Sequence, residues 1–351
     1  MTLNDIFAAL GVVINGIPQA ILALAVGFEA FPTSLGFLVG VIACLLLQSP
    51  IPISMQAETI ALAGSLGKDK RERLSIIFWA GIIMSFLGMT GLLSLIVKIA
   101  GEEIINAMMA GVGLILAKIA IEGIRTTPQI SGLSTLVALI TYFLSKRNLV
   151  YTIVISVLVS SIYANVKKMK IGENLGKEER KFRIRKPAMS TSILRGALAL
   201  SCLTIGANIA FGNITANLGS TVNNVDYLTV YSGLADTISS LFGGAPVESI
   251  ISATGASDNP VNSGVLMMVI LGLIMFLGFL PKLGKYVPGE SIHGFLFVLG
   301  ALVTVPTNAS LAFATGGADM ALLSAITMTV TSATDPFFGL MAGIILKFLL
   351  L

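Results

Sequence analysis

The sequence predicts an all-α polytopic membrane protein, with fourteen transmembrane segments arranged as two inverted repeats of seven. Three observations lead to this prediction. Of the 351 residues, 55% are hydrophobic and 11% are charged, whereas soluble domains carry about 25% charged residues. Apolar segments follow one another along the whole chain. A short acidic motif occurs once in each half, in segments that hold corresponding places.

The apolar segments form two sets of seven, which flank a polar basic connector at 167–189. The first repeat, 1–166, contains segments at 4–28, 35–48, 53–66, 74–99, 104–122, 130–144 and 148–166. The second repeat, 190–351, contains segments at 190–211, 228–242, 247–257, 262–281, 290–305, 309–332 and 336–351. Because each repeat has an odd number of spans, the second enters the membrane from the opposite side.

The third and tenth segments carry the repeated motif, and they are shorter than the roughly 20 residues that a spanning helix needs. Residues 57–64 read AETIALAG and residues 247–255 read VESIISATG. Prolines precede both motifs, at Pro50, Pro52 and Pro246, and proline interrupts a regular helix. We therefore expect two broken helices, one per repeat, whose N-termini build a substrate site.

Ionisable residues inside a membrane are costly and mark functional sites. The candidates in apolar segments are Glu58, Lys118, Glu122, Asp236, Glu248, Glu290, His293 and Asp319. Glu58 and Glu248 rank first because they begin the two broken helices, where free backbone N–H groups favour a carboxylate or an anionic ligand. We expect both to bind substrate or a coupling ion, H⁺ or Na⁺. The alternative is that each glutamate only caps its helix.

Other polar residues carry weaker signals. Asn208, Asn213 and Asn217 must find partners within the bilayer, so they bridge helices or contact a polar ligand. Bridging is the simpler interpretation for Asn217. His293 lies beside Glu290, and a structural hydrogen-bonding pair is a simpler interpretation there than a proton relay.

The composition argues against several functions. Cys44 and Cys202 lie in apolar runs and the chain has one histidine, so we expect no disulfide framework, metal site or cofactor. We find no set of nucleophile, base and orienting residue, so an enzyme is not expected. The basic residues cluster in loops, which relates to membrane topology and not to nucleic acid.

Four stretches, taken together, indicate a family. They are LIVKIAG at 95–101, ITANL at 214–218, GLADTISSLFGGAP at 233–246 and VPGESIHGFLFVLG at 287–300. In order and spacing, the chain resembles the nucleobase–cation symporter-2 family of uracil, xanthine and purine permeases over nearly its whole length.

This resemblance implies how the fold is divided. A core domain would comprise about 1–99 and 190–305, and a gate domain about 100–166 and 306–351. The third and tenth spans would each begin as a short strand and continue as a half-helix. Substrate would lie between these two spans and the eighth.

The resemblance also implies where the substrate-binding groups lie. By position, the family's acids fall at Ala207 and Ser252 and its histidine at Phe211, and none of the three is ionisable here. Backbone contacts fall near Thr59 and Ile251. We expect the two repeated glutamates to replace the missing acids, and the ring at 211 to stack on a planar solute. The predicted site comprises Glu58, Thr59, Asn208, Phe211, Asn213, Glu248, Ser249, Ile251 and Ser252.

We expect a secondary active transporter of a small polar solute, a nucleobase of the uracil, xanthine or purine type, coupled to H⁺ or Na⁺. The alternatives are an organic cation or an anion on the same fold, or a non-coupled channel. Two glutamates argue against a small inorganic anion, because like charges repel. The partners would be the solute and the lipid bilayer of a prokaryotic-type inner (plasma) membrane. A homodimer is one of the oligomeric states that the sequence leaves open.

The lysine and arginine counts predict an orientation. Basic residues gather after the odd-numbered spans, at 68–73, Arg125, the connector and 282–285, which places these loops in the cytoplasm and both termini outside. The uracil permeases have cytoplasmic termini, which would place the connector outside. A cysteine introduced within 172–181 should be shielded from an impermeant thiol reagent added to intact cells. Rapid labelling would contradict this orientation and favour that of the family.

Overall fold

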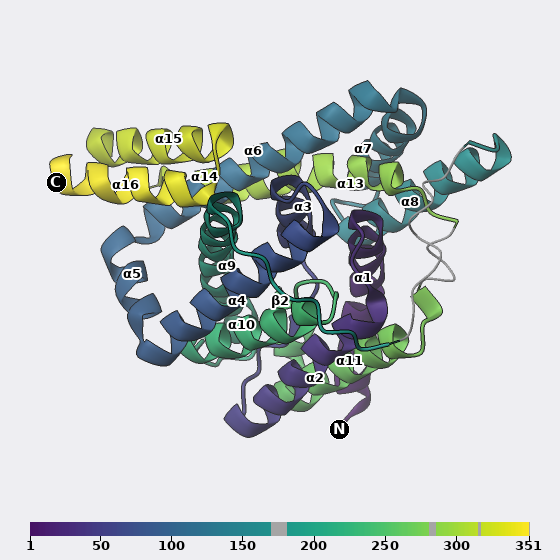
Figure 1. Ribbon diagram of the computed structural model, residues 1–351, viewed down its shortest axis with the longest axis horizontal. Helices are drawn as coiled ribbons and strands as arrows, with labels where there is room; N and C mark the ends of the chain where they lie inside the picture. Colours follow the sequence, from purple (N-terminus) through teal and green to yellow (C-terminus); the bar gives the residue numbers. More distant parts are fainter. Residues whose placement is uncertain (170–180, 281–285, 315–316, 351) are drawn as a thin grey trace. The chain divides into compact units, whose positions relative to one another are not determined.

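The computed structural model describes residues 1–169, 181–280, 286–314 and 317–350 (Figure 1). The chain divides into two compact units, and each unit combines segments from both halves of the sequence. Unit 1 comprises Met1–Ile96 and Lys177–Lys282, and unit 2 comprises Val97–Gly176 and Leu283–Leu351. Six of the described helices are long and apolar enough to cross a membrane.

Unit 1 contains the elements that carry the repeated motif. Its described elements are α1 (Leu3–Val26), α2 (Ala30–Leu47), β1 (Ile53–Ser54), α3 (Ala57–Leu66), α4 (Lys70–Thr90), α9 (Thr191–Leu218), α10 (Val225–Leu241), β2 (Glu248–Ser249), the 3₁₀ turn η3 (Ala253–Ala256) and α11 (Pro260–Phe276). Helix α10 packs along α4 and also contacts α2, which packs on α11 (Figure 1). Asp69, Ser190 and Asn224 cap the N-termini of α4, α9 and α10, because each side chain accepts a hydrogen bond from a first-turn backbone N–H.

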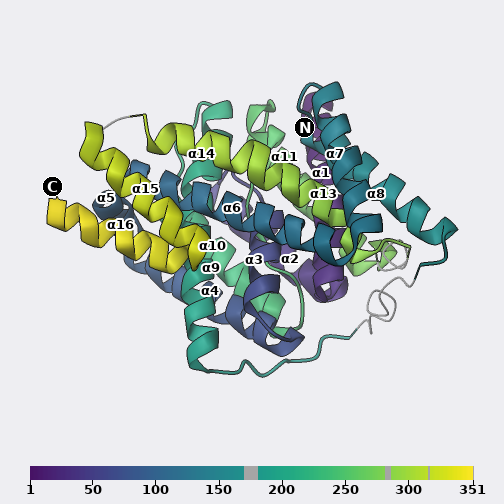
Figure 2. The same ribbon diagram turned by 90° about the horizontal axis from the view of Figure 1, so that it is seen from above.

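Unit 2 is organised around one long helix. After α5 (Leu92–Ala100), which joins the two units, its described elements are α6 (Glu102–Thr126), η1 (Pro128–Gly132), α7 (Leu133–Leu144), α8 (Leu149–Val166), η4 (Gly289–Ile292), α13 (His293–Phe297), η5 (Val298–Thr304), α14 (Val305–Ala312), α15 (Gly317–Ala333) and α16 (Pro336–Leu350). Helix α6 contacts α13, α14, α15 and α16, and α7 packs on α8 (Figure 2).

The two broken segments meet in a two-stranded antiparallel sheet. Strand β1 pairs with β2 so that Ile53 lies opposite Ser249 and Ser54 lies opposite Glu248. Helix α3 follows β1, as expected for the third segment. The tenth segment differs, because β2 is followed only by the 3₁₀ turn η3 and not by an α-helical half-helix. Pro260 occupies the first turn of α11, a position that proline favours.

One part of the expected domain division differs from the structure. Residues 283–305 were expected in the core domain with most of unit 1, yet they belong to unit 2. The reason is close packing between α13 and α7. A Cβ atom at Gly294 would clash with the backbone of Ser134, and the Ser134 hydroxyl donates to the carbonyl of Ser291 at 2.5 Å. Only glycine permits this approach.

The described end of the basic connector runs against unit 1. Ala188 donates its backbone N–H to the Ser75 hydroxyl at 2.9 Å, and its carbonyl accepts from the indole of Trp79 at 3.0 Å. The backbone N–H of Arg185 donates to the Leu241 carbonyl at 2.7 Å. Residues 170–180, which include most of the segment proposed for cysteine labelling, lie outside the described residues.

Helices α4 and α10 cross at a pair of glycines. A Cβ atom at Gly81 would lie 2.5 Å from the carbonyl oxygen of Gly233, and a Cβ atom at Gly233 would lie 2.7 Å from the carbonyl oxygen of Gly81. Small residues at such crossings let helix backbones approach closely within a membrane. This crossing fixes α10 against α4, and α10 carries one of the acidic residues of the site.

Candidate functional site

The centre of the candidate site is the carboxylate of Glu248 on β2. Its Oε2 atom accepts a hydrogen bond from the Thr59 hydroxyl of α3 at 2.8 Å, and Oε1 accepts from the Thr204 hydroxyl of α9 at 2.6 Å. The Glu248 side chain is fully buried. The pairing of β1 with β2 brings this strand to the first turn of α3, so one carboxylate joins both broken segments to α9.

Asp236 on α10 is the second acidic group. Its side chain is 2% exposed, and its Oδ1 atom accepts from the backbone N–H of Val247 at 2.6 Å. The carboxyl groups of Asp236 and Glu248 are direct neighbours that interact with each other. Two carboxyl groups can form a hydrogen bond when one of them carries a proton. The two side chains therefore make up a buried pair of carboxyl groups.

Glu58 is the third acidic group, and it lies in the first turn of α3 as predicted. It is 8% exposed, and its carboxylate is a close electrostatic neighbour of Glu248. Among the described residues, its hydrogen-bonding partner is its own backbone N–H. This carboxylate therefore keeps acceptor capacity for a ligand.

The expected equivalence of Glu58 and Glu248 is wrong. Glu248 lies on a strand and not at a helix start, and it pairs with Ser54, four residues before Glu58. The strand pairing therefore does not place the two copies of the Glu-Thr/Ser-Ile motif opposite each other. Glu58 is nevertheless an electrostatic neighbour of Glu248. One acidic substrate site built from both repeats stays a prediction.

The predicted asparagines connect elements of unit 1. The Asn208 amide donates to the hydroxyls of Thr229 and Ser232 at 3.0 and 3.3 Å, and its oxygen accepts from Ser249 at 2.7 Å. Asn208 is fully buried, so it bridges α9, α10 and β2. Asn213 accepts from the amide of Asn223 at 3.1 Å.

The remaining predicted residues follow β2 or lie on α9. The backbone N–H of Ser252 donates to the Thr215 hydroxyl at 3.0 Å, and that hydroxyl donates to the Ile250 carbonyl at 2.9 Å. These contacts fix the chain after β2 to α9. Ile251 is 48% exposed. Phe211 is half-buried and lies one turn after Asn208 on α9.

His293 belongs to unit 2 and takes no part in the acidic group. Its Nδ1 atom hydrogen-bonds to the Ser131 hydroxyl at 2.9 Å. A Cβ atom at Gly123 would clash with the same ring nitrogen, so the imidazole packs directly on α6. These contacts describe a packed, hydrogen-bonded histidine.

Sequence reasoning ranked Asp236 below the two glutamates and left it out of the site. The available signal was a carboxylate in the middle of the apolar segment at 228–242. Its pairing with Glu248 depends on the crossing of α10 and β2, which no local sequence pattern reports. Thr204 was missed for the same reason.

No protein-family model and no curated protein sequence matches the chain. Solved structures share its fold. The transmembrane domain of a cyanobacterium bicarbonate transporter, BicA, gives a TM-score of 0.72 at 14% identity, over 97% of this chain and 96% of that chain. The murine Solute Carrier 26 family member A9 (Slc26a9) anion transporter in the inward-facing state gives 0.72 at 14% identity, over 99% and 68%. A structure of SLC26A9 gives 0.74 at 14% identity, over 99% and 64%.

The shared fold confirms the predicted fold class. The chain is an integral membrane protein with the helical fold of these transmembrane domains, built from two inverted repeats. The resemblance to the nucleobase–cation symporters implied the same fold. Membership of that family stays a prediction.

Proposed function

We propose that this protein is a secondary active transporter that carries a nucleobase together with protons. The observation that carries the proposal is the group of three buried carboxyl groups, Glu58, Asp236 and Glu248, where the two broken segments meet α9 and α10. Buried acidic residues in membrane segments mark substrate or ion pathways and proton relays. Broken segments at the repeat interface are where transporters of this architecture bind their substrates.

The carboxyl pair supports a proton as the coupling ion. Asp236 and Glu248 are neighbouring buried carboxyl groups, and such a pair favours the form in which one of the two carries a proton. A change in the contacts of Glu248, through Thr59 on α3 or Thr204 on α9, would change how strongly the pair holds that proton. Symport requires that solute binding and proton binding influence each other, and these contacts connect the broken segments to the carboxyl pair. Sodium remains the alternative ion.

The charge of the site supports a neutral solute with N–H donors. Two unit charges 4 Å apart interact by about 4 kcal/mol at an effective dielectric constant of 20, so an anion beside ionised Glu58 would be repelled. A nucleobase ring presents N–H groups that a carboxylate can accept, and it presents a planar face on which Phe211 could stack. The described polar contacts of Glu248 and Asp236 come from hydroxyl, carboxyl and backbone groups.

Anion transport is the second candidate. Two of the solved neighbours are described as a bicarbonate transporter and an anion transporter. The N-terminus of α3 also favours an anion, because Gln56 provides no side-chain cap and leaves backbone N–H groups available. Under this alternative Glu58 would have to be neutral when the anion binds.

A thermal-shift screen of the purified protein separates these candidates. A ligand that binds only the folded state stabilises it by about 2.7 kcal/mol at a concentration one hundred times its Kd. We expect uracil, xanthine or a purine base to raise Tm without Na⁺, more strongly at mildly acidic than at alkaline pH. A shift with bicarbonate, chloride or sulfate and none with nucleobases would contradict the nucleobase proposal. An absolute requirement for Na⁺ would contradict the proton.

A further inference from the structure

Unit 1 contains a cavity with basic lining residues, which the proposed transport site does not use. It has a volume of about 330 Å³ and is lined by Lys70 and Arg71 at the start of α4, and by Arg185 and Lys186 in the segment before α9. None of the described residues that line it is acidic. Four cationic side chains from two distant parts of the sequence therefore converge on one space.

Backbone contacts hold these two basic pairs together. The Ser75 hydroxyl donates to the carbonyl of Arg71 at 2.7 Å and accepts from the backbone N–H of Ala188 at 2.9 Å. One hydroxyl thus connects the first turns of α4 to the segment that carries Arg185 and Lys186. The hydrogen bond from Arg185 N–H to Leu241 anchors that segment to the end of α10. The cluster is built by the fold and does not depend on the side chains alone.

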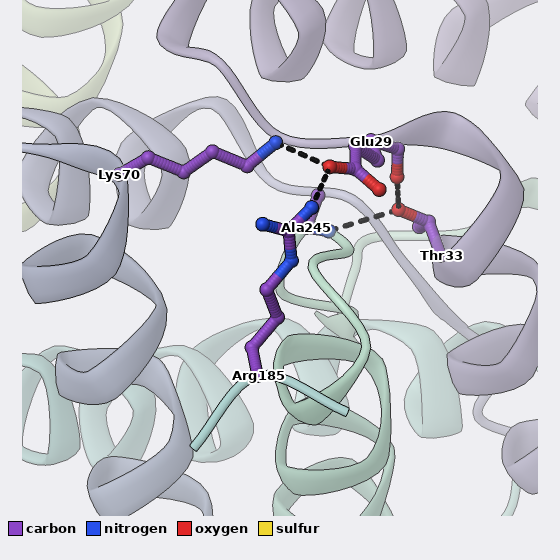
Figure 3. Close-up of polar contacts among 5 residues, drawn as sticks. All are labelled: Glu29, Thr33, Lys70, Arg185 and Ala245. Carbon is purple, nitrogen blue, oxygen red and sulfur yellow. Dashed lines mark hydrogen bonds and ion pairs between the residues drawn. The ribbon is translucent and has the colours of Figure 1, made fainter. Parts of the chain in front are cut away.

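Glu29 neutralises only part of this charge. Its Oε1 atom accepts from Nζ of Lys70 at 2.5 Å and from a guanidinium nitrogen of Arg185 at 2.7 Å (Figure 3). Arg71 and Lys186 are exposed. Among the described residues that line the cavity, four are cationic, and Glu29 pairs with two of them. This excess of positive charge favours an anionic ligand.

The walls of the cavity are apolar on the α4 side. Phe78 and Leu74 line it, and the same face of α4 continues with Ile82 and Phe86, which are 40% and 57% exposed. Positions 78, 82 and 86 are spaced i, i+4 and i+8, so they form one stripe along the helix. Helix α4 is apolar enough to cross a membrane. A cationic cavity thus opens beside an exposed apolar stripe.

We propose that this cavity binds the phosphate of an anionic phospholipid, whose acyl chains lie along the α4 stripe. Arginine and lysine hold phosphate oxygens through charge-assisted hydrogen bonds, and basic pockets beside membrane helices bind anionic headgroups. A free phosphate ion would use the cations but not the stripe, so the combination favours a lipid. This proposal does not depend on the identity of the transported solute.

The test measures lipid retention on the full-length protein in detergent by native mass spectrometry. Phosphatidylglycerol and phosphatidylcholine are titrated in parallel, with inorganic phosphate and glycerol phosphate as soluble competitors. We expect saturable phosphatidylglycerol binding, which weakens at least about tenfold when Arg71→Gln and Lys186→Gln are combined, since each basic residue contributes to attraction of an anionic lipid. The matched control combines Lys146→Gln and Arg147→Gln, two exposed residues of unit 2 with the same loss of charge, and it should bind as the native protein does.

Three results would overturn the proposal. Equal retention of the two lipids would show that headgroup charge is irrelevant. Displacement of lipid by either soluble phosphate would assign the cavity to a free ligand. An equal loss in the control variant would indicate a general effect of net charge. The single variants Arg71→Gln and Lys186→Gln serve if the double variant fails to fold, and the comparison of lipids on the native protein needs no variant.

Discussion

Replacing Glu248 by glutamine is expected to lower the initial rate of coupled uptake at least about tenfold, which corresponds to about 1.4 kcal/mol of lost interaction. Glutamine keeps the size of the side chain and one acceptor oxygen, but it cannot hold or release a proton. It would therefore remove the pair of carboxyl groups with Asp236. It would leave one acceptor oxygen for the two hydroxyls of Thr59 and Thr204, so one hydroxyl must turn to accept from the amide. The measurement is uptake of the solute that gives the largest thermal shift, at several pH values.

Glu58→Gln is expected to cause a loss of similar size, because we propose that the Glu58 carboxylate accepts a hydrogen bond from the solute. Glu102→Gln is the matched control, since Glu102 also lies in the first turn of a helix but is exposed in unit 2. Insertion and Tm of all three variants should stay near native values. If both Glu58→Gln and Glu248→Gln transport at the native rate with unchanged pH dependence, the glutamates are structural only.

Replacing Gly81 by alanine is expected to destabilise the protein by about 1–3 kcal/mol, the usual range for overpacking in a well-packed core. The added Cβ would lie 2.5 Å from the Gly233 carbonyl oxygen and 2.8 Å from the Thr237 backbone nitrogen. Backbone atoms cannot rotate away, so α4 and α10 must separate. The measurement is thermal unfolding in detergent, followed by transport by the folded fraction.

Gly11→Ala is the control for this substitution. Gly11 lies within α1, and among the described residues no neighbouring atom beyond its own stretch of helix comes within 4 Å of the place that an added Cβ would take. Alanine has the higher helix propensity, so this variant should be as stable as the native protein or slightly more stable. Equal stability of Gly81→Ala and Gly11→Ala would contradict the close crossing of α4 and α10.

The sequence predicted the fold class and the places of the broken segments, because prolines and hydropathy act locally. It placed Glu58 correctly in the first turn of α3. It misplaced Glu248, because the similarity of the two motifs suggested two similar helix starts. The tenth segment forms a strand that is followed by a single 3₁₀ turn before α11, and Glu248 lies on that strand.

Tertiary packing decided what the sequence could not. Asp236 becomes part of the site only because α10 carries it to β2, where it pairs with Glu248. The Asn208 side chain forms hydrogen bonds with three side chains of α10 and β2. This favours the interpretation that Asn208 bridges these elements over the interpretation that it contacts a ligand. Residues 283–305 belong to unit 2, and not to the core domain as expected, because Gly294 packs on Ser134. Each of these contacts joins residues far apart in the chain.

Accumulation in proteoliposomes tests the central claim most directly, that the buried carboxyl groups couple a solute to protons. Purified protein is reconstituted, an inward proton gradient is imposed without Na⁺, and uptake of labelled nucleobase is followed over time. The account predicts accumulation above the outside concentration, collapse when a protonophore is added, and no accumulation by Glu248→Gln. Equilibration without accumulation would show that transport is not coupled to protons. Accumulation that persists in Glu248→Gln would contradict the role assigned to the carboxyl pair.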